Sequence, residues 1–265
     1  MIPNILSIAG SDPSGGAGIQ ADLKTISALG GYGMAAITAL TAQNTQGVTG
    51  IHVPPASFIT QQIDAIFDDI EVHAVKIGML ANGEIVNAVA ERLLAHGATN
   101  IVLDPVLVAT SGASLGDPDV VDAMIARLLP LAAIVTPNLP EAARLTGLAA
   151  ETDQEILARA MVDKGCRAVL VKGGHLSGAT AEDYLFDGET LRTFSAPRVD
   201  TANTHGTGCT LSSAIATHLA KDHHLGDAIS AAKSYLTAAL ETSDKLNVGK
   251  PEAGHGPVHH FHAFR

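Results

Sequence analysis

The chain has 265 residues and a formal net charge of -11, and 46% of it is hydrophobic against 16% charged. This composition provides enough apolar material for a large buried core and argues against disorder. The negative charge and the aromatic content of 3%, without tryptophan, argue against a nucleic-acid surface, so small molecules are the expected partners.

Short β-rich apolar runs alternate with segments of helical spacing along the chain. The predicted buried strands are 4–9, 34–41, 74–77, 100–103, 133–135 and 168–171. The predicted helices are 17–29, 55–67, 84–96, 118–129, 139–145, 153–164, 208–221 and 227–245. This alternation predicts an α/β sandwich of parallel strands with right-handed crossovers, and ligands at the carboxyl ends of the strands.

A hairpin interrupts this alternation late in the chain. The runs 184–186 and 190–194 flank Asp187-Gly188, a typical hairpin turn, and are expected to add an antiparallel pair to the sheet. The tail 249–265 is rich in Gly, Pro and His, and its periodicity predicts no element. We expect residues 1–265 to form one domain.

The cysteines and the N-terminus bear on the compartment. Cys166 and Cys209 do not resemble a disulfide framework, and the first residues lack the basic region of a signal peptide. No apolar run is long enough to cross a bilayer. We therefore expect a cytoplasmic protein without membrane partners.

The segment NTHGTGCTLSSAIA, residues 203–216, carries the clearest chemical signal. Gly206, Thr207 and Gly208 bring backbone N–H groups to a predicted helix start, where the helix dipole favours a phosphate. The same dipole is expected to hold Cys209 as a thiolate that takes a proton from an attacking hydroxyl at neutral pH. The alternative is a small buried hydrophobe in an ordinary glycine turn.

A second glycine-rich segment, residues 9–18, follows the first strand. Its glycines stand too far from the strand for a dinucleotide fingerprint, so a substrate loop is favoured over a plain surface turn. Asp22 and Lys24 follow on the first helix, where such residues are typical of a solvated face. Gln43 ends the second strand, and its amide complements an aminopyrimidine edge, although it could equally bridge loops.

Further polar residues follow later strands. Asp104 ends the fourth strand, while Asn138 and Glu141 follow the fifth, and their oxygens could hold Mg²⁺ through water. As an alternative, Asn138 and Glu141 could cap a helix. Lys172 ends the sixth strand before two glycines, where it could meet a polyphosphate or simply emerge into solvent.

The histidines do not indicate a metal centre. The chain has 12, several of them in the segment 257–262, but the two cysteines are far apart and no ligand spacing of a structural zinc site is present. His175 and His205 are instead expected to line the anion pocket.

These motifs together resemble those of the hydroxymethylpyrimidine/phosphomethylpyrimidine kinases of thiamine biosynthesis, within the ribokinase-like vitamin kinases. The resemblance covers nearly the whole chain and is carried by AGSDPSGGAGIQADLKT, TALTAQNT, KIGML, TPNLPEA, KGGH, NTHGTGCTLSSAIA and GPVHHFHA. It implies a three-layer α/β/α ribokinase-like fold, a homodimer, and two ATP- and Mg²⁺-dependent phosphorylations of an aminopyrimidine alcohol. Sugar kinases of the superfamily carry an aspartate in place of Cys209, which points away from sugars.

The resemblance also implies roles for particular residues. Gly10, Asp22, Gln43 and Met79 are expected to contact the pyrimidine, and Cys209 its hydroxymethyl oxygen. Lys172 and the amides of residues 206–209 are expected to hold the transferred phosphate, with Asp104, Asn138 and Glu141 at the metal and nucleotide end. Two alternatives remain open at this point: a pyridoxal kinase of the same fold, and a non-catalytic sensor of nucleotide or thiamine precursor.

Overall fold

The computed structural model describes residues 1–107, 118–174, 178–249 and 255–264. Its strands are β1 (Asn4–Ser11), β2 (Tyr32–Asn44), β3 (Gly47–His52), β4 (Ala74–Ile77), β5 (Ile101–Leu103), β6 (Ile134–Val135), β7 (Val169–Val171), β8 (Thr180–Phe186) and β9 (Leu191–Pro197). Its α-helices are α1 (Gly18–Ala28), α2 (Ala56–Phe67), α3 (Gly83–Ala95), α4 (Pro118–Ala123), α5 (Leu139–Thr146), α6 (Gln154–Asp163), α7 (Thr207–Leu219) and α8 (Leu225–Glu241). A π-helix, Met124–Leu128, continues α4, and a 3-10 helix, Ser243–Lys245, follows α8.

The strands form one sheet in the order β3-β2-β1-β4-β5-β6-β7-β8-β9. Strands β2, β1, β4, β5, β6 and β7 run parallel, so their carboxyl ends share one edge. The hairpin β8–β9 is antiparallel and completes the sheet beyond β7, as the Asp187-Gly188 turn predicted. The predicted α/β class with a mostly parallel sheet is confirmed.

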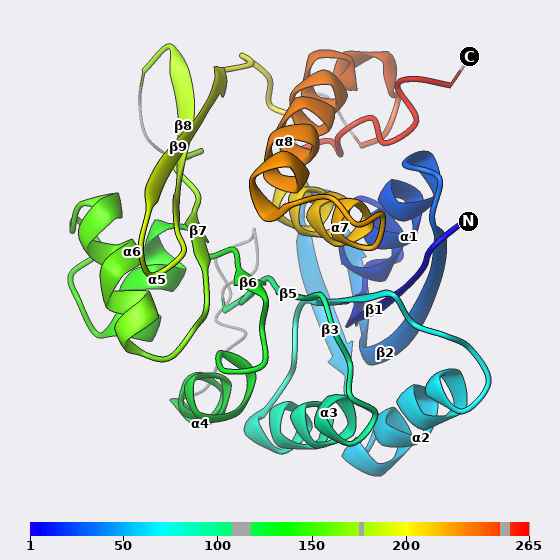
Figure 1. Cartoon of the computed structure of the whole chain (residues 1–265). Coiled ribbons are helices and arrows are strands. Elements are labelled where there is room, and N and C mark those ends of the chain that lie inside the picture. Colours follow the sequence, from blue (N-terminus) through cyan, green and yellow to red (C-terminus); the bar gives the residue numbers. More distant parts are fainter. Residues whose placement is uncertain (108–117, 175–177, 250–254, 265) are drawn as a thin grey trace.

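Helices cover both faces of this sheet because side chains alternate along its buried strands. Ile5 and Val102 belong to a cluster with α1, α7 and α8, whereas their neighbours Leu6 and Leu103 pack with the helices of the other face. Figure 1 shows α1, α7 and α8 together on one side of the sheet and α2, α3 and α4 on the other. The expected three layers are present.

Strand β3 is the element that the sequence did not predict. It pairs antiparallel with β2, from Leu40 opposite His52 to Asn44 opposite Gly47. Its last four residues are exposed and it contains two glycines, so it lacks the buried apolar run that marks the inner strands.

Among the described residues, no helix combines the length and apolarity needed to span a bilayer.

Candidate active site

The predicted site residues lie along the shared edge of the parallel strands. Gly10 is in the last residues of β1, Gln43 in those of β2, and Met79 comes two residues after β4. Asp104 follows β5 directly and Lys172 follows β7. Parallel strands with right-handed crossovers bring these positions to one edge although they are far apart in the sequence.

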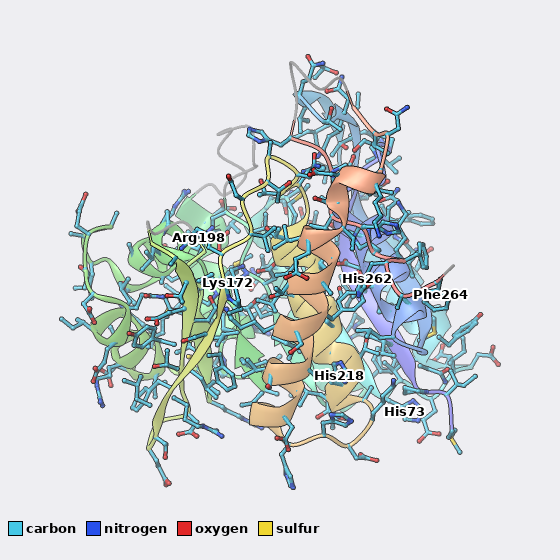
Figure 2. The ribbon with its side chains drawn as sticks, turned by 90° about the horizontal axis from the view of Figure 1, so that it is seen from above. His73, Lys172, Arg198, His218, His262 and Phe264 are labelled. Atoms are coloured by element: carbon cyan, nitrogen blue, oxygen red, sulfur yellow. The ribbon has the colours of Figure 1, made fainter. Side chains whose placement is uncertain are left out.

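An ion pair marks the centre of this edge. The Lys172 Nζ lies 2.8 Å from Asp104 Oδ1, and Thr136 Oγ1 donates to the same oxygen at 3.1 Å. Burial opposes both charges, but the carboxylates of Asp104 and Glu141 raise the pKa of Lys172, and the two ammonium groups of Lys172 and Lys76 lower the pKa of Asp104. The pair therefore stays ionised. Figure 2 shows Lys172 near the middle of the molecule, between the hairpin side and α8.

Asn138 and Glu141 form the helix cap that the sequence offered as an alternative. Asn138 Oδ1 accepts from the Glu141 N–H at 2.9 Å, and Glu141 Oε2 accepts from the Asn138 N–H at 2.8 Å, which is a capping box at the start of α5. Burial raises the pKa of Glu141 to about 7, while Lys172 acts to lower it. Because Asn138 also bridges to Lys172 in the sheet, the cap stands beside the ion pair.

These carboxylates provide a partial cation site. Among the residues that the structure describes, no three His, Cys, Asp or Glu side chains are arranged to hold a metal ion. Asp104 and Glu141 supply carboxylate oxygens, the ligand type that Mg²⁺ prefers, and the ion usually completes its shell with water and substrate phosphates. The donor set therefore fits Mg²⁺ only together with such further oxygens.

The glycine turn before α7 reaches the same ion pair. A Cβ on Gly208 would lie 3.3 Å from both Asp104 Oδ2 and Lys172 Nζ, so the helix start lies against these groups. The first N–H groups of a helix have no partner within it, and of these Thr207 donates to Thr204 O. Within the described residues, no acceptor is assigned to the amides of Gly208 and Cys209. Backbone donors, a cation and a helix dipole thus converge on one point, an arrangement suited to a phosphate.

Two backbone segments meet closely to make this turn possible. Gly206 has φ +81°, and a Cβ there would lie 1.8 Å from the carbonyl oxygen of Gly16. In the loop 12–18, Asp12 accepts from the N–H groups of Ser14 and Ala17, and its Oδ2 lies 2.7 Å from His205 Nε2. The glycine-rich loop is therefore locked onto the α7 turn and is not a plain surface turn.

His205 was predicted to line the anion pocket. In the structure His205 is buried, and it joins Asp12 to the C-terminal segment: its ring Nε2 contacts Asp12 Oδ2, and its backbone N–H donates to Gly256 O. His175, predicted for the same pocket, lies outside the described residues.

The C-terminal segment, which periodicity left unassigned, packs onto α7 and α8. His260 Nε2 lies 3.2 Å from Thr210 Oγ1, and the Tyr235 hydroxyl donates to His260 O. Figure 2 shows His262 and Phe264 on this segment beside α8, where the His262 ring lies 5.0 Å from that of Tyr235. Burial lowers the pKa of His260 to about 3, so this histidine is neutral.

The sequence predicted that Asp22 lies on a solvated helix face or contacts the pyrimidine, and its surroundings in the structure match neither description. Its carboxylate is fully buried, not on a solvated face, and it lies 2.9 Å from Lys76 Nζ through each oxygen. Ser213 Oγ donates to Oδ1 at 2.7 Å and Ser7 Oγ to Oδ2 at 2.6 Å. Because protein donors occupy both oxygens, the structure does not present Asp22 to a substrate. Sequence reasoning gave Lys76 no role, although this lysine lies within the predicted buried strand 74–77.

The other expected pyrimidine contacts lie in adjacent strands. Met79 packs over Gly10, since a Cβ on Gly10 would lie 2.7 Å from Met79 Cε. Gly10 stands at an irregularity in the register between β1 and β2. Gln43 is half-buried, and its Oε1 accepts from Thr41 Oγ1 at 3.1 Å. Glycine backbone, a flexible apolar side chain and an amide therefore line this end of the site.

A cleft of about 520 Å³ lies beside the Lys172 loop, between β9 and α8. Lys233 forms part of its wall and donates to Asp183 Oδ2, while Asp183 Oδ1 accepts from the Gly173 N–H at 3.0 Å. The backbone next to Lys172 is thereby tied to α8.

Cys209 stands in the first turn of α7, as predicted, but its surroundings oppose the thiolate that was predicted at neutral pH. Burial raises the pKa of its thiol from the ordinary 9.0 to about 11, although Lys76 and a backbone hydrogen bond from Gly18 act to lower it. The loss of water and the charges of Asp22 and Asp104 thus oppose the thiolate that a helix start favours. The thiol is therefore the predominant form of Cys209 at pH 7.5.

This pKa predicts slow alkylation of Cys209. Iodoacetamide should label it slowly at pH 7.5 and about tenfold faster for each further pH unit up to about 10, because the thiolate is the nucleophile. Mass spectrometry of the Cys209 peptide measures the rate, with free cysteine in the same solution as the control. A rate that levels off by pH 8 would contradict the raised pKa.

Comparisons with known proteins bear on the identity of this site. A family model described as phosphomethylpyrimidine kinase matches residues 12–259. The chain is 53% identical to the hydroxymethylpyrimidine/phosphomethylpyrimidine kinase of Salmonella typhimurium, over 98% of both chains.

Solved structures agree in fold. The phosphomethylpyrimidine kinase of Clostridium difficile superposes with a TM-score of 0.80 and 42% identity, covering 90% of this chain and 99% of that one. An ADP complex of Bacillus subtilis pyridoxal kinase gives a TM-score of 0.88 and 35% identity, covering 98% of both chains. With the family model matching most of its length, this chain belongs to the phosphomethylpyrimidine kinase family.

Proposed function

We propose that this chain transfers the γ-phosphate of ATP to the hydroxymethyl group of 4-amino-5-hydroxymethyl-2-methylpyrimidine, and then a second phosphate to the monophosphate, in thiamine biosynthesis. The convergence of Lys172, Asp104 and the α7 amides beside Cys209 supports phosphoryl transfer. The relative of 53% identity, whose name includes both kinase activities, supports the substrate.

In the first reaction the hydroxymethyl oxygen attacks the γ-phosphorus. A new P–O bond forms, the bond between γ-phosphorus and the bridging oxygen breaks, and ADP leaves with that electron pair. Lys172 and the amides of Gly208 and Cys209 neutralise charge on the transferred group. The hydroxyl proton passes to the sulfur of Cys209 in the small fraction of molecules in which this sulfur is a thiolate. This thiolate is a strong base because the pKa of the thiol is about 11.

The pyrimidine is proposed to lie over Gly10 and Met79, with Gln43 at its amino edge. The close packing of Met79 on Gly10 supports an apolar floor for a flat ring. Asp22, whose oxygens are occupied by Lys76, Ser7 and Ser213, is assigned to the support of the site and not to substrate contact.

Mg²⁺ is proposed at Asp104 and Glu141, with water and ATP phosphates completing its shell. When bound, the ion supplies positive charge to the phosphate oxygens. Asn138 holds Glu141 in place through the capping box, so the carboxylate is fixed before the nucleotide arrives.

The proposed specificity predicts the outcome of a direct comparison of acceptors. ADP release with the aminopyrimidine alcohol and with its monophosphate should each exceed the rate without acceptor, and pyridoxal should be the poorest of the three. The 35% identity to a pyridoxal kinase keeps that activity as the second candidate. Fastest turnover with pyridoxal would reverse the assignment, and no acceptor-dependent release would favour a sensor.

The two phosphorylations should respond differently to loss of the sulfur. Cys209→Ala is expected to lower kcat for the alcohol about 100-fold, the typical contribution of a positioned base. The monophosphate reaction should change by less than about tenfold, since its nucleophile is largely ionised near neutral pH. In the wild type, the alcohol rate should also rise with pH between 7 and 9 while the monophosphate rate stays flat. Equal losses in both reactions would rule out the base role.

The metal site predicts a change in Mg²⁺ requirement. Glu141→Gln should raise the Mg²⁺ concentration for half-maximal activity about tenfold at saturating ATP, as loss of a water-mediated contact does. Glu155→Gln, on the exposed surface of α6, is the matched control and should leave it unchanged. An unaltered requirement in Glu141→Gln would remove Glu141 from the metal site.

A further inference from the structure

We infer that Lys76 is a positioning residue for Cys209: a buried ammonium group, held one helical turn below the sulfur, that stabilises the negative charge which Cys209 gains when it takes a proton. Neither the sequence motifs nor the comparisons assign a role to this lysine. Its effect on Cys209 is a property of the structure alone, and its consequence for catalysis rests on the proposed function.

Lys76 is placed where an isolated charge would be very costly. Among the residues that the structure describes it is the largest fully buried side chain, and it lies in the middle of β4, between β1 and β5. Burying a lysine without a partner would favour loss of its proton. Burial opposes the charge of Lys76, but Asp22, which contacts the ammonium with both oxygens, acts together with the charges of Cys209 and Asp104, and the pKa of Lys76 is raised.

The location of Cys209 above this pair follows from two helices that meet at their first turns. Gly18, at the start of α1, donates a backbone hydrogen bond to Cys209 in the first turn of α7. Four residues further along each helix, Asp22 and Ser213 are joined by a 2.7 Å hydrogen bond. Residues four apart lie on the same helical face, about 5.4 Å along the axis. The Asp22 carboxylate and its Lys76 partner therefore lie one turn below the sulfur.

The glycine that follows β4 makes room for the Lys76 ammonium. A Cβ on Gly78 would lie 2.8 Å from Lys76 Nζ, so the glycine after β4 leaves the space that Nζ occupies. The Lys76 Nζ donates to both oxygens of Asp22 at 2.9 Å, and an ammonium group has three N–H donors.

The charges around the sulfur are few and can be separated by mutation. Lys76 favours the thiolate, whereas Asp22 and Asp104 oppose it, and Lys172 interacts favourably with the same thiolate. Asp22 thus has two opposing effects: it keeps Lys76 charged, and it neutralises much of the field that Lys76 exerts on Cys209. When only the carboxylate charge of Asp22 is removed, the charge of Asp104 still favours the Lys76 ammonium, which is then left to pair with the sulfur.

The test is the rate of Cys209 alkylation by iodoacetamide in the full-length protein, without substrate, followed by mass spectrometry between pH 7 and 10. Asp22→Asn should label at least about tenfold faster than the wild type at pH 7.5, equivalent to one unit of thiol pKa. Adding Lys76→Met to Asp22→Asn should abolish this gain and bring labelling below the wild-type rate. Ser213→Ala removes a hydrogen bond from the same carboxylate without changing a charge, and should stay within about twofold of the wild type.

Two results would overturn the inference. One is a gain in Asp22→Asn that persists in the double variant, or appears equally in Ser213→Ala, since looser packing would then be the cause. The other is no gain in a folded Asp22→Asn protein, checked by circular dichroism. If Asp22→Asn does not fold, the double variant decides alone, because labelling as fast as the wild type or faster contradicts a stabilising Lys76.

The catalytic consequence has its own readout. In Asp22→Asn the rise of alcohol phosphorylation with pH should begin at lower pH, and the monophosphate profile should keep its shape. If labelling responds as described but no acceptor is phosphorylated by the wild type, the proposed function fails while the coupling of Lys76 to Cys209 stands. If phosphorylation occurs and labelling does not respond, only the role of Lys76 fails.

Discussion

The site depends on one close approach between two stretches of backbone. Gly206 can pass the carbonyl oxygen of Gly16 only because neither position carries a side chain, and Gly206 adopts a left-handed conformation that suits glycine. This contact places the start of α7 over the strand ends and sets Gly208 against Asp104 and Lys172. An alanine at Gly206 would meet backbone and not a side chain that could move aside. The proposed phosphate site therefore depends on the space that this glycine leaves as much as on charge.

Charge is then arranged in pairs around this turn. Lys76 with Asp22 and Lys172 with Asp104 are both nearly or fully buried, a costly arrangement that often contributes little net stability. Their positions next to the α7 start suggest another reason for their presence: an anionic substrate adds charge to the site, and fixed cations with satisfied partners need no rearrangement to receive it. Burial also raises the pKa values of Glu141 and Cys209, because it disfavours a further anion at this site.

Residues that are far apart in the sequence hold the glycine-rich loop and the α7 turn together. Asp12 orders the glycine-rich loop, His205 joins that loop to the α7 turn, and the segment from Gly256 to His260 closes over both. The histidines of this tail thus act as hydrogen-bonding and packing groups. This explains why they follow no metal-ligand spacing even though the tail contains several of them.

Much of this protein could be read from its sequence by local rules. Apolar runs and helical periods predicted the inner strands and helices to within a few residues, and the order of strand and helix placed Asp104, Lys172 and Cys209 at one edge, because parallel connections allow little else. The helix-cap alternative for Asn138 and Glu141 is confirmed by the capping box, and their metal role stays a prediction. Strand β3 escaped because exposed strands with glycines lack a hydrophobic signal.

What only the tertiary structure decided concerns burial and its electrostatic consequences. Asp22 has the local sequence of a solvated helix residue, yet α7 and β4 cover it and turn it into the partner of Lys76. Cys209 has the local sequence of an activated thiolate, yet desolvation and the charges of Asp22 and Asp104 raise the pKa of its thiol. A helix dipole is a local property that sequence predicts, whereas the solvent and charges around a group depend on segments brought together from the entire chain.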